Sequence, residues 1–151
     1  DILNPQIKKA LVSKIKSNNI GEYLTLEILE SEKVSSFDTV NEFINDVKQK
    51  KNKIAIDDFG TGFSSLSYLN SFPFSKIKID QSFVHSMQTD KSRALIRAIL
   101  SLGNALDMKT LAEGVETEEQ SDYLALNGCM EAQGFLISKP VPFSETQQLI
   151  T

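Results

Sequence analysis

Stretches typical of strands alternate with amphipathic helical stretches along this sequence, and that alternation limits the fold more than any other feature. A helical stretch comes first, and five strand-helix pairs follow it. The predicted strands are residues 23–29, 54–56, 76–80, 110–115 and 132–137. Strict alternation of this kind indicates parallel strands joined by right-handed crossovers. The sequence therefore predicts an α/β fold, either a doubly wound open sheet or a barrel.

The helices are predicted from caps and from apolar residues at helical spacing. Residues with capping or stop patterns are Asn4-Pro5, Ser35-Ser36, Thr117 with Gln120, and Asn127-Gly128. Segment 90–106 is predicted to be a long helix whose buried face carries Leu95, Ile99, Leu102 and Leu106. A short helix is expected through Leu66 and Leu69, and a closing helix over 143–150. The segment between the third strand and residue 90, which contains His85, is predicted to be irregular.

Ionisable or amide side chains recur at or near the end of every predicted strand. They are Glu27, Glu30, Asp57, Asp58, Lys78, Asp80, Glu113, Glu116 and Gln133. In a (β/α)8 barrel the carboxyl ends of all strands converge on one face, where the active site is built from several strands. An open sheet concentrates its ligand contacts at a switch point instead. The sequence thus favours a TIM-like (β/α)8 barrel in incomplete form, with five parallel strands and six helices here and three strands expected upstream.

Asp57 and Asp58 follow Ile54, Ala55 and Ile56, a run that is apolar enough to be a strand buried on both faces. Two ionised carboxylates at such a position repel each other and lose hydration, so a positive group is expected beside them. The alternative is that both side chains only cap the turn that follows. Because successive strand residues point to opposite faces, one of the two aspartates is expected to lie already in the turn.

The acidic residues Glu27, Asp57, Asp58 and Glu113 offer oxygen ligands, which favour Mg²⁺ or Mn²⁺ over a structural zinc site. Two such ions, bridged by a carboxylate, can activate a water for displacement at phosphorus, so phosphodiester hydrolysis is the natural reaction class. Lys78 could orient that water or neutralise phosphate charge. A salt bridge to a neighbouring carboxylate is the alternative for it.

Sixteen basic against twenty acidic side chains make the chain mildly acidic, which argues against a DNA-binding groove. No apolar run approaches the length of a membrane span, so direct membrane insertion is not expected. Cys129 is the only cysteine, and we expect it to pack as a small apolar residue. A single cysteine fits a reducing compartment, so we expect a cytoplasmic location for the protein.

Four segments carry a resemblance to a known family. They read D-D-F-G-T-G-F-S-S-L-S-Y-L, K-I-D-Q-S-F-V, L-A-E-G-V-E-T-E-E-Q and Q-G-F-L-I-S-K-P-V-P, in this order. Together they resemble the C-terminal two-thirds of the EAL domain, the cyclic di-GMP phosphodiesterase family. The resemblance spans residues 1–151 as one partial domain, without the strands that carry the E-A-L signature.

The resemblance implies hydrolysis of cyclic di-GMP to linear pGpG with Mg²⁺ or Mn²⁺. It implies that Glu27, Asp57, Asp58 and Glu113 are metal ligands, and that Lys78 contacts the catalytic water. Glu30 would anchor the loop from Phe59 to Ser65, and Gln133 would support the site. From their positions, Glu116 and Asp80 are expected to support loops. The family also implies a homodimer through the loop and helix after Asp58, and attached sensory or cyclase domains are expected.

Three interpretations follow. The first is a piece of an active phosphodiesterase that by itself lacks activity, because a Glu and an Asn ligand of the family belong to strands outside this sequence. The second is a degenerate domain that binds cyclic di-GMP or a protein partner without hydrolysis. The third is an unrelated carboxylate-metal barrel, such as an enolase-like enzyme. The visible motif positions favour the first, although Leu29, Phe63 and Gln81 replace residues more usual in the family.

Overall fold

The computed structural model describes residues 4–18, 23–30, 37–48, 53–62, 69 and 72–146. The chain divides into two compact units, Asp1–Ile77 and Lys78–Thr151. The boundary between them falls inside strand β3 (Lys76–Ile79), which therefore contributes residues to both units.

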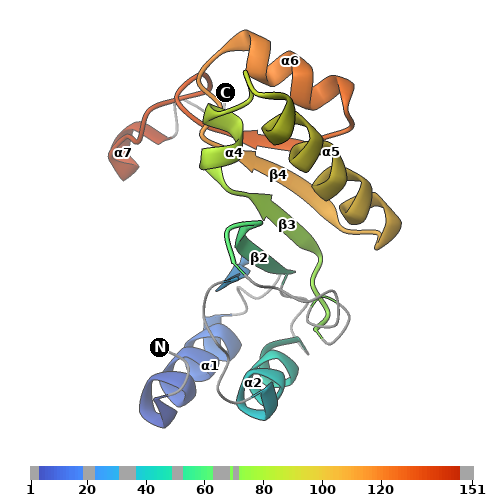
Figure 1. The fold of residues 1–151 in the computed structure, drawn as a ribbon. Helices are drawn as coiled ribbons and strands as arrows, with labels where there is room; N and C mark the ends of the chain where they lie inside the picture. Colours follow the sequence, from blue (N-terminus) through green and yellow to red (C-terminus); the bar gives the residue numbers. More distant parts are fainter. Residues whose placement is uncertain are drawn as a thin grey trace. The chain divides into compact units, whose positions relative to one another are not determined.

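The α/β class is confirmed, and its strands are parallel. The strands are β1 (Thr25–Leu29), β2 (Lys53–Phe59), β3, β4 (Lys109–Glu113) and β5 (Glu131–Gln133), hydrogen-bonded in chain order. The described residues also form six helices, labelled in Figure 1: α1 (Pro5–Asn18), α2 (Phe37–Lys48), α4 (Gln81–His85), α5 (Asp90–Ala105), α6 (Glu118–Leu126) and α7 (Phe143–Thr146). In the part of the chain that is described, no helix is long and apolar enough to cross a membrane.

In the first unit, α1 and α2 lie side by side (Figure 1). The predicted cap of α1 is confirmed, because Asn4 Oδ1 accepts hydrogen bonds from the amides of Gln6 (2.9 Å) and Ile7 (3.3 Å). Buried Ile15 of α1 and Phe43 of α2 form the core of this helix pair. The residues predicted to open α2, Ser35 and Ser36, lie outside the described residues.

In the second unit, α5 runs alongside β4, and α6 lies next to α5 (Figure 1). The predicted buried face of α5 is partly wrong: Leu95 and Leu106 are each 39% exposed, whereas Ile96 and Leu100 are buried together with Ile99. The buried stripe also includes Ser92 and Gly103, and it is therefore centred on Ile96, Ile99 and Leu100 rather than on Leu95. For α6 the capping box of Thr117 and Gln120 and the stop at Asn127 and Gly128 are confirmed.

Other boundaries differ from the prediction. The fifth strand ends at Gln133, not at Ile137, because the amide of Ile137 turns back to bond the Gly134 carbonyl (3.1 Å). The segment that contains His85 is not irregular but begins with α4, which Asp80 caps by accepting from the Ser82 amide (3.0 Å). The closing helix is described only over α7, and the helix predicted through Leu66 lies outside the described residues except at Leu69.

Candidate functional site

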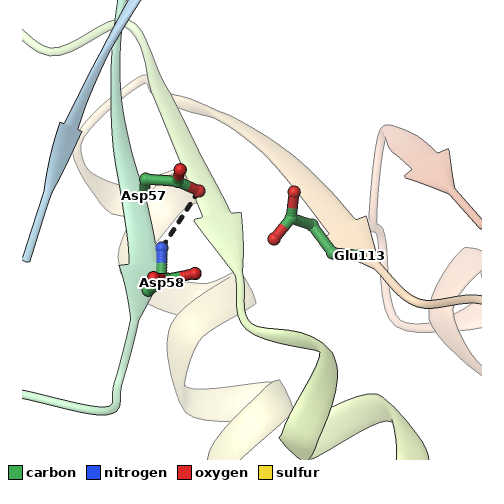
Figure 2. A group of neighbouring side chains, drawn as sticks. All are labelled: Asp57, Asp58 and Glu113. Atoms are coloured by element: carbon green, nitrogen blue, oxygen red, sulfur yellow. Dashed lines mark hydrogen bonds between the residues drawn. The ribbon is translucent and has the colours of Figure 1, made fainter.

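Both members of the aspartate pair belong to β2, which continues to Phe59. The prediction that one of them lies beyond the strand is therefore wrong in its boundary. Asp58 nevertheless leaves regular strand geometry, because its φ is +53°. Its amide donates to Oδ1 of Asp57 (3.1 Å; Figure 2), and both side chains are half-buried. The carbonyl of Asp58 accepts from the amide (3.3 Å) and the hydroxyl (2.9 Å) of Thr61, which closes the turn.

Glu30 holds the glycine turn that follows the aspartate pair. Its own amide donates to the Asp57 carbonyl (3.0 Å), which places it beside the end of β2. Its Oε2 atom accepts from the amides of Gly60 and Gly62, each at 2.8 Å. One carboxylate oxygen thus binds two main-chain donors of the loop. Residues 63–65 of the same loop lie outside the described residues.

Glu27 lies in the middle of β1 and is exposed. Across the parallel pairing it stands opposite Ala55, whereas Asp57 stands opposite Leu29. Glu27 thus lies two residues before the position opposite Asp57. Among the described residues, it does not form a close group of three carboxylates with Asp57 and Asp58.

In the second unit, Glu113 is the last residue of β4 and forms a salt bridge with Lys78, with Nζ 2.9 Å from Oε1. The two side chains are 8% and 19% exposed. A lysine this deeply buried requires a compensating charge, and Glu113 supplies one. The salt bridge that sequence analysis offered as the alternative for Lys78 is thus present.

The remaining predicted residues of this unit surround the end of β4. Gln133 stands opposite Glu113 in the β4–β5 pairing and is exposed, and its carbonyl accepts from the Val115 amide (3.1 Å). Glu116 lies in the loop between β4 and α6, with Oε1 3.7 Å from Nε2 of His85. Asp80 follows β3 and caps α4.

Sequence analysis missed Gly114 and, although it predicted Gln120 in the capping box of α6, it missed the bond of Gln120 to α4. Gly114 has φ +69° and lies against α4. Gln120 bonds the main chain of Glu116, Thr117 and Val84. The only signals in the sequence are the glycine directly after Glu113 and the capping box of α6.

Cys129 is half-buried, and its thiol lies 3.3 Å from the carbonyl of Glu131. Burial raises the pKa of this thiol, although nearby hydrogen bonds oppose the shift. The expectation of a packing role agrees with these surroundings.

The carboxylates drawn in Figure 2 project from strand ends, Asp57 and Asp58 from β2 and Glu113 from β4. All three side chains offer hard carboxylate oxygens. Mg²⁺ and Mn²⁺ prefer such ligands, so the carboxylates of each unit suit these ions by their chemistry.

Residues 1–140 match the sequence model of the EAL domain. Among curated proteins, the chain is 41% identical over 121 residues to MucR of Pseudomonas aeruginosa, a bifunctional diguanylate cyclase/cyclic di-GMP phosphodiesterase. The match covers 80% of this chain and 18% of MucR. The chain spans 15% to 18% of the length of the first four curated relatives that it matches.

Two solved structures show the same fold. The EAL domain of DcpA from Mycobacterium smegmatis has a TM-score of 0.85 at 38% identity, covering 94% of this chain and 65% of that one. BlrP1 of Klebsiella pneumoniae, solved with manganese and cyclic di-GMP, has a TM-score of 0.79 at 30% identity, covering 91% and 36%. These neighbours are TIM-barrel-like, so the predicted fold class is confirmed.

Proposed function

This chain belongs to the EAL domain family, and from that membership we propose that the protein containing it hydrolyses cyclic di-GMP to linear pGpG with Mg²⁺ or Mn²⁺. The observation that carries the proposal is the salt bridge between Glu113, at the end of β4, and buried Lys78, whose Nζ lies 2.9 Å from Oε1. Asp57 and Asp58, near the end of β2, add two further carboxylates. Similarity to MucR and to the manganese complex of BlrP1 supports the same substrate and the same class of ion.

In this proposal Asp57, Asp58 and Glu113 bind the cation through carboxylate oxygens, and Glu27 is assigned the same role by the resemblance alone. The cation, when bound, supplies positive charge to the phosphodiester and lowers the pKa of the attacking water. Glu113 keeps Lys78 charged and oriented, so that the ammonium donates a hydrogen bond to that water. The water oxygen would bond to phosphorus while one P–O ester bond breaks, and the proton that the water gives up would balance the one taken up by the leaving alkoxide, which becomes a hydroxyl.

The other predicted residues hold the segments that carry the carboxylate ligands and Lys78. Glu30 keeps the turn after Asp58 closed through the Gly60 and Gly62 amides. Gln133 supports Glu113 from the paired strand, and Asp80 and Glu116 hold the two loops beside it.

We further propose that the complete protein is a cytoplasmic-facing homodimer with sensory or cyclase domains attached. The short share of MucR that this chain spans supports the presence of further domains in such a protein. Because the resemblance assigns two more ligands to strands outside this sequence, the 151-residue chain alone is expected to show negligible hydrolysis.

The test is turnover of cyclic di-GMP by the complete protein in Mn²⁺, with pGpG quantified by chromatography. Asp57→Asn is expected to lower kcat by at least about a hundredfold, because it removes a charged oxygen ligand. Asp46→Asn is the matched control, since Asp46 is exposed on α2 of the same unit, where its carboxylate lies 3.8 Å from Nζ of Lys8.

Full activity of Asp57→Asn would contradict the metal assignment. Tight binding of cyclic di-GMP without any pGpG from the unsubstituted protein would instead favour the binding-only interpretation.

A further inference from the structure

Gly114 follows Glu113 directly and lies in contact with α4. A Cβ atom at this position would lie 2.6 Å from Cβ of Gln81 and 2.9 Å from Nε2 of His85. The first of these atoms belongs to the base of a helix side chain, so it cannot move without the helix. The φ of +69° adds a second barrier, since this conformation disfavours any residue with a Cβ.

The helix against which Gly114 lies is held at both ends. Asp80 caps its first turn through the Ser82 amide (3.0 Å). At its last turn, Oγ of the C-cap residue Ser86 lies 2.8 Å from Oγ of Ser92, which is buried in α5. Val84 in the middle is fully buried. α4 is therefore fixed in place and cannot move aside to make room for a side chain at residue 114.

The chain after Gly114 is also bonded to α4. Nε2 of Gln120 donates to the Val84 carbonyl of α4 (3.3 Å). Oε1 of Gln120 accepts from the amides of Glu116 (2.8 Å) and Thr117 (3.1 Å). One side chain thus joins the loop beyond Gly114 to α4, so a shift at residue 114 cannot be absorbed by moving that loop.

We propose that Gly114 is a positioning residue for Glu113. Its close contact with α4 sets the main chain at the end of β4, and so the place of the Glu113 carboxylate in its salt bridge with Lys78. The inference rests on the proposed function, in which Glu113 is a metal ligand. A side chain at residue 114 would displace Glu113 and weaken cation binding without touching a ligand atom.

The experiment compares Gly114→Ala with Gly128→Ala in the complete protein. Gly128 also has a positive φ (+85°), but a Cβ there would meet no atom within 4 Å. Both variants carry the strain of an alanine at positive φ, and only one carries the collision. Mn²⁺ affinity is measured from the electron paramagnetic resonance signal of free Mn²⁺, and kcat and KM are measured alongside.

Gly114→Ala is expected to weaken Mn²⁺ binding about tenfold or more relative to Gly128→Ala, the range seen when groups that orient metal ligands are altered. The double variant Gln81→Gly/Gly114→Ala removes the Cβ that residue 114 would meet, and is expected to recover part of the affinity. If Gly114→Ala does not fold, the same double variant decides: recovery of folded, Mn²⁺-binding protein supports the proposal, and no recovery overturns it.

Equal Mn²⁺ affinity of the two single variants, in a protein that hydrolyses cyclic di-GMP, would overturn this inference and leave the proposed function intact. Absence of Mn²⁺ binding and turnover in the unsubstituted protein would overturn both.

Discussion

The ends of β2 and β4 both present acidic side chains, but the two turns that follow them are held in different ways. After β2, one carboxylate oxygen of Glu30 accepts from two glycine amides at 2.8 Å. After β4, neutral hydrogen bonds of Gln120 hold the loop, and the main chain also packs closely on the main chain that follows β5. A Cβ at Gly134 would lie 2.1 Å from the Val115 carbonyl oxygen, and the Leu136 amide bonds that same oxygen at 3.0 Å.

The difference indicates which property of each turn is sensitive. A turn held by a charged acceptor depends on that charge, because hydrogen bonds to ionised groups are stronger than neutral ones. A turn held by contact depends on volume, because a packed interior has no room for an added methyl group. Substitutions that alter charge and volume separately can test this distinction.

The largest effect is expected from Gly134→Ala. The new methyl group would overlap the main chain of Val115, which cannot turn away as a side chain would. We expect a loss of about 3 kcal/mol or more in the free energy of unfolding, at the upper end for overpacking. Urea denaturation measures it, with Gly128→Ala as the control. A loss no greater than that of the control would show that the chain at the end of β5 can shift to accommodate the methyl group.

A smaller effect is expected from Lys78→Met, which removes the salt bridge between Lys78 and Glu113. In the presence of EDTA we expect a loss of about 2 kcal/mol in unfolding free energy, because a partly buried charge loses its partner. In Mn²⁺ the loss should shrink, since the proposed cation also compensates Glu113. Lys109→Met removes an exposed ion pair of the same unit and should cost about 0.5 kcal/mol or less. Equal losses with and without Mn²⁺ would contradict a cation at Glu113.

The smallest effect is expected from Glu30→Gln, which keeps the volume and an oxygen but removes the charge. The loss should be about 1 kcal/mol, the difference between a charged and a neutral acceptor. It should appear as faster hydrogen exchange at the amides of Gly60 and Gly62, by about fivefold. Glu42→Gln, at an exposed position of α2, should leave these amides unchanged. Unchanged exchange in Glu30→Gln would show that the β2 turn does not depend on charge.

Much of the fold could be predicted from the sequence, because its signals are local. Apolar Ile54, Ala55 and Ile56 indicated a doubly buried strand, and they are 3%, 0% and 0% exposed. The caps at Asn4 and Thr117 involve donors within three residues, so sequence alone suffices to recognise them.

The errors have a common physical origin in contacts between distant segments. The apolar residues after Gln133 suggested a longer strand, but Gly134 packs on Val115 and the chain turns there. Helix α4 has five residues, too few for a periodic pattern. For the candidate site, carboxylate chemistry could be inferred from residue types. The contact of Gly114 with α4 could not, because it joins residues about thirty positions apart.

The main-chain conformation of Asp58 limits which residues can replace it during the evolution of the domain. Its φ of +53° is a conformation that aspartate and asparagine adopt more readily than other residues with a side chain. Asparagine would preserve the main chain and remove the negative charge, whereas glutamate would preserve the charge and strain the main chain. Few substitutions are therefore neutral here, and a lineage that gives up the charge can do so in one step while keeping its fold.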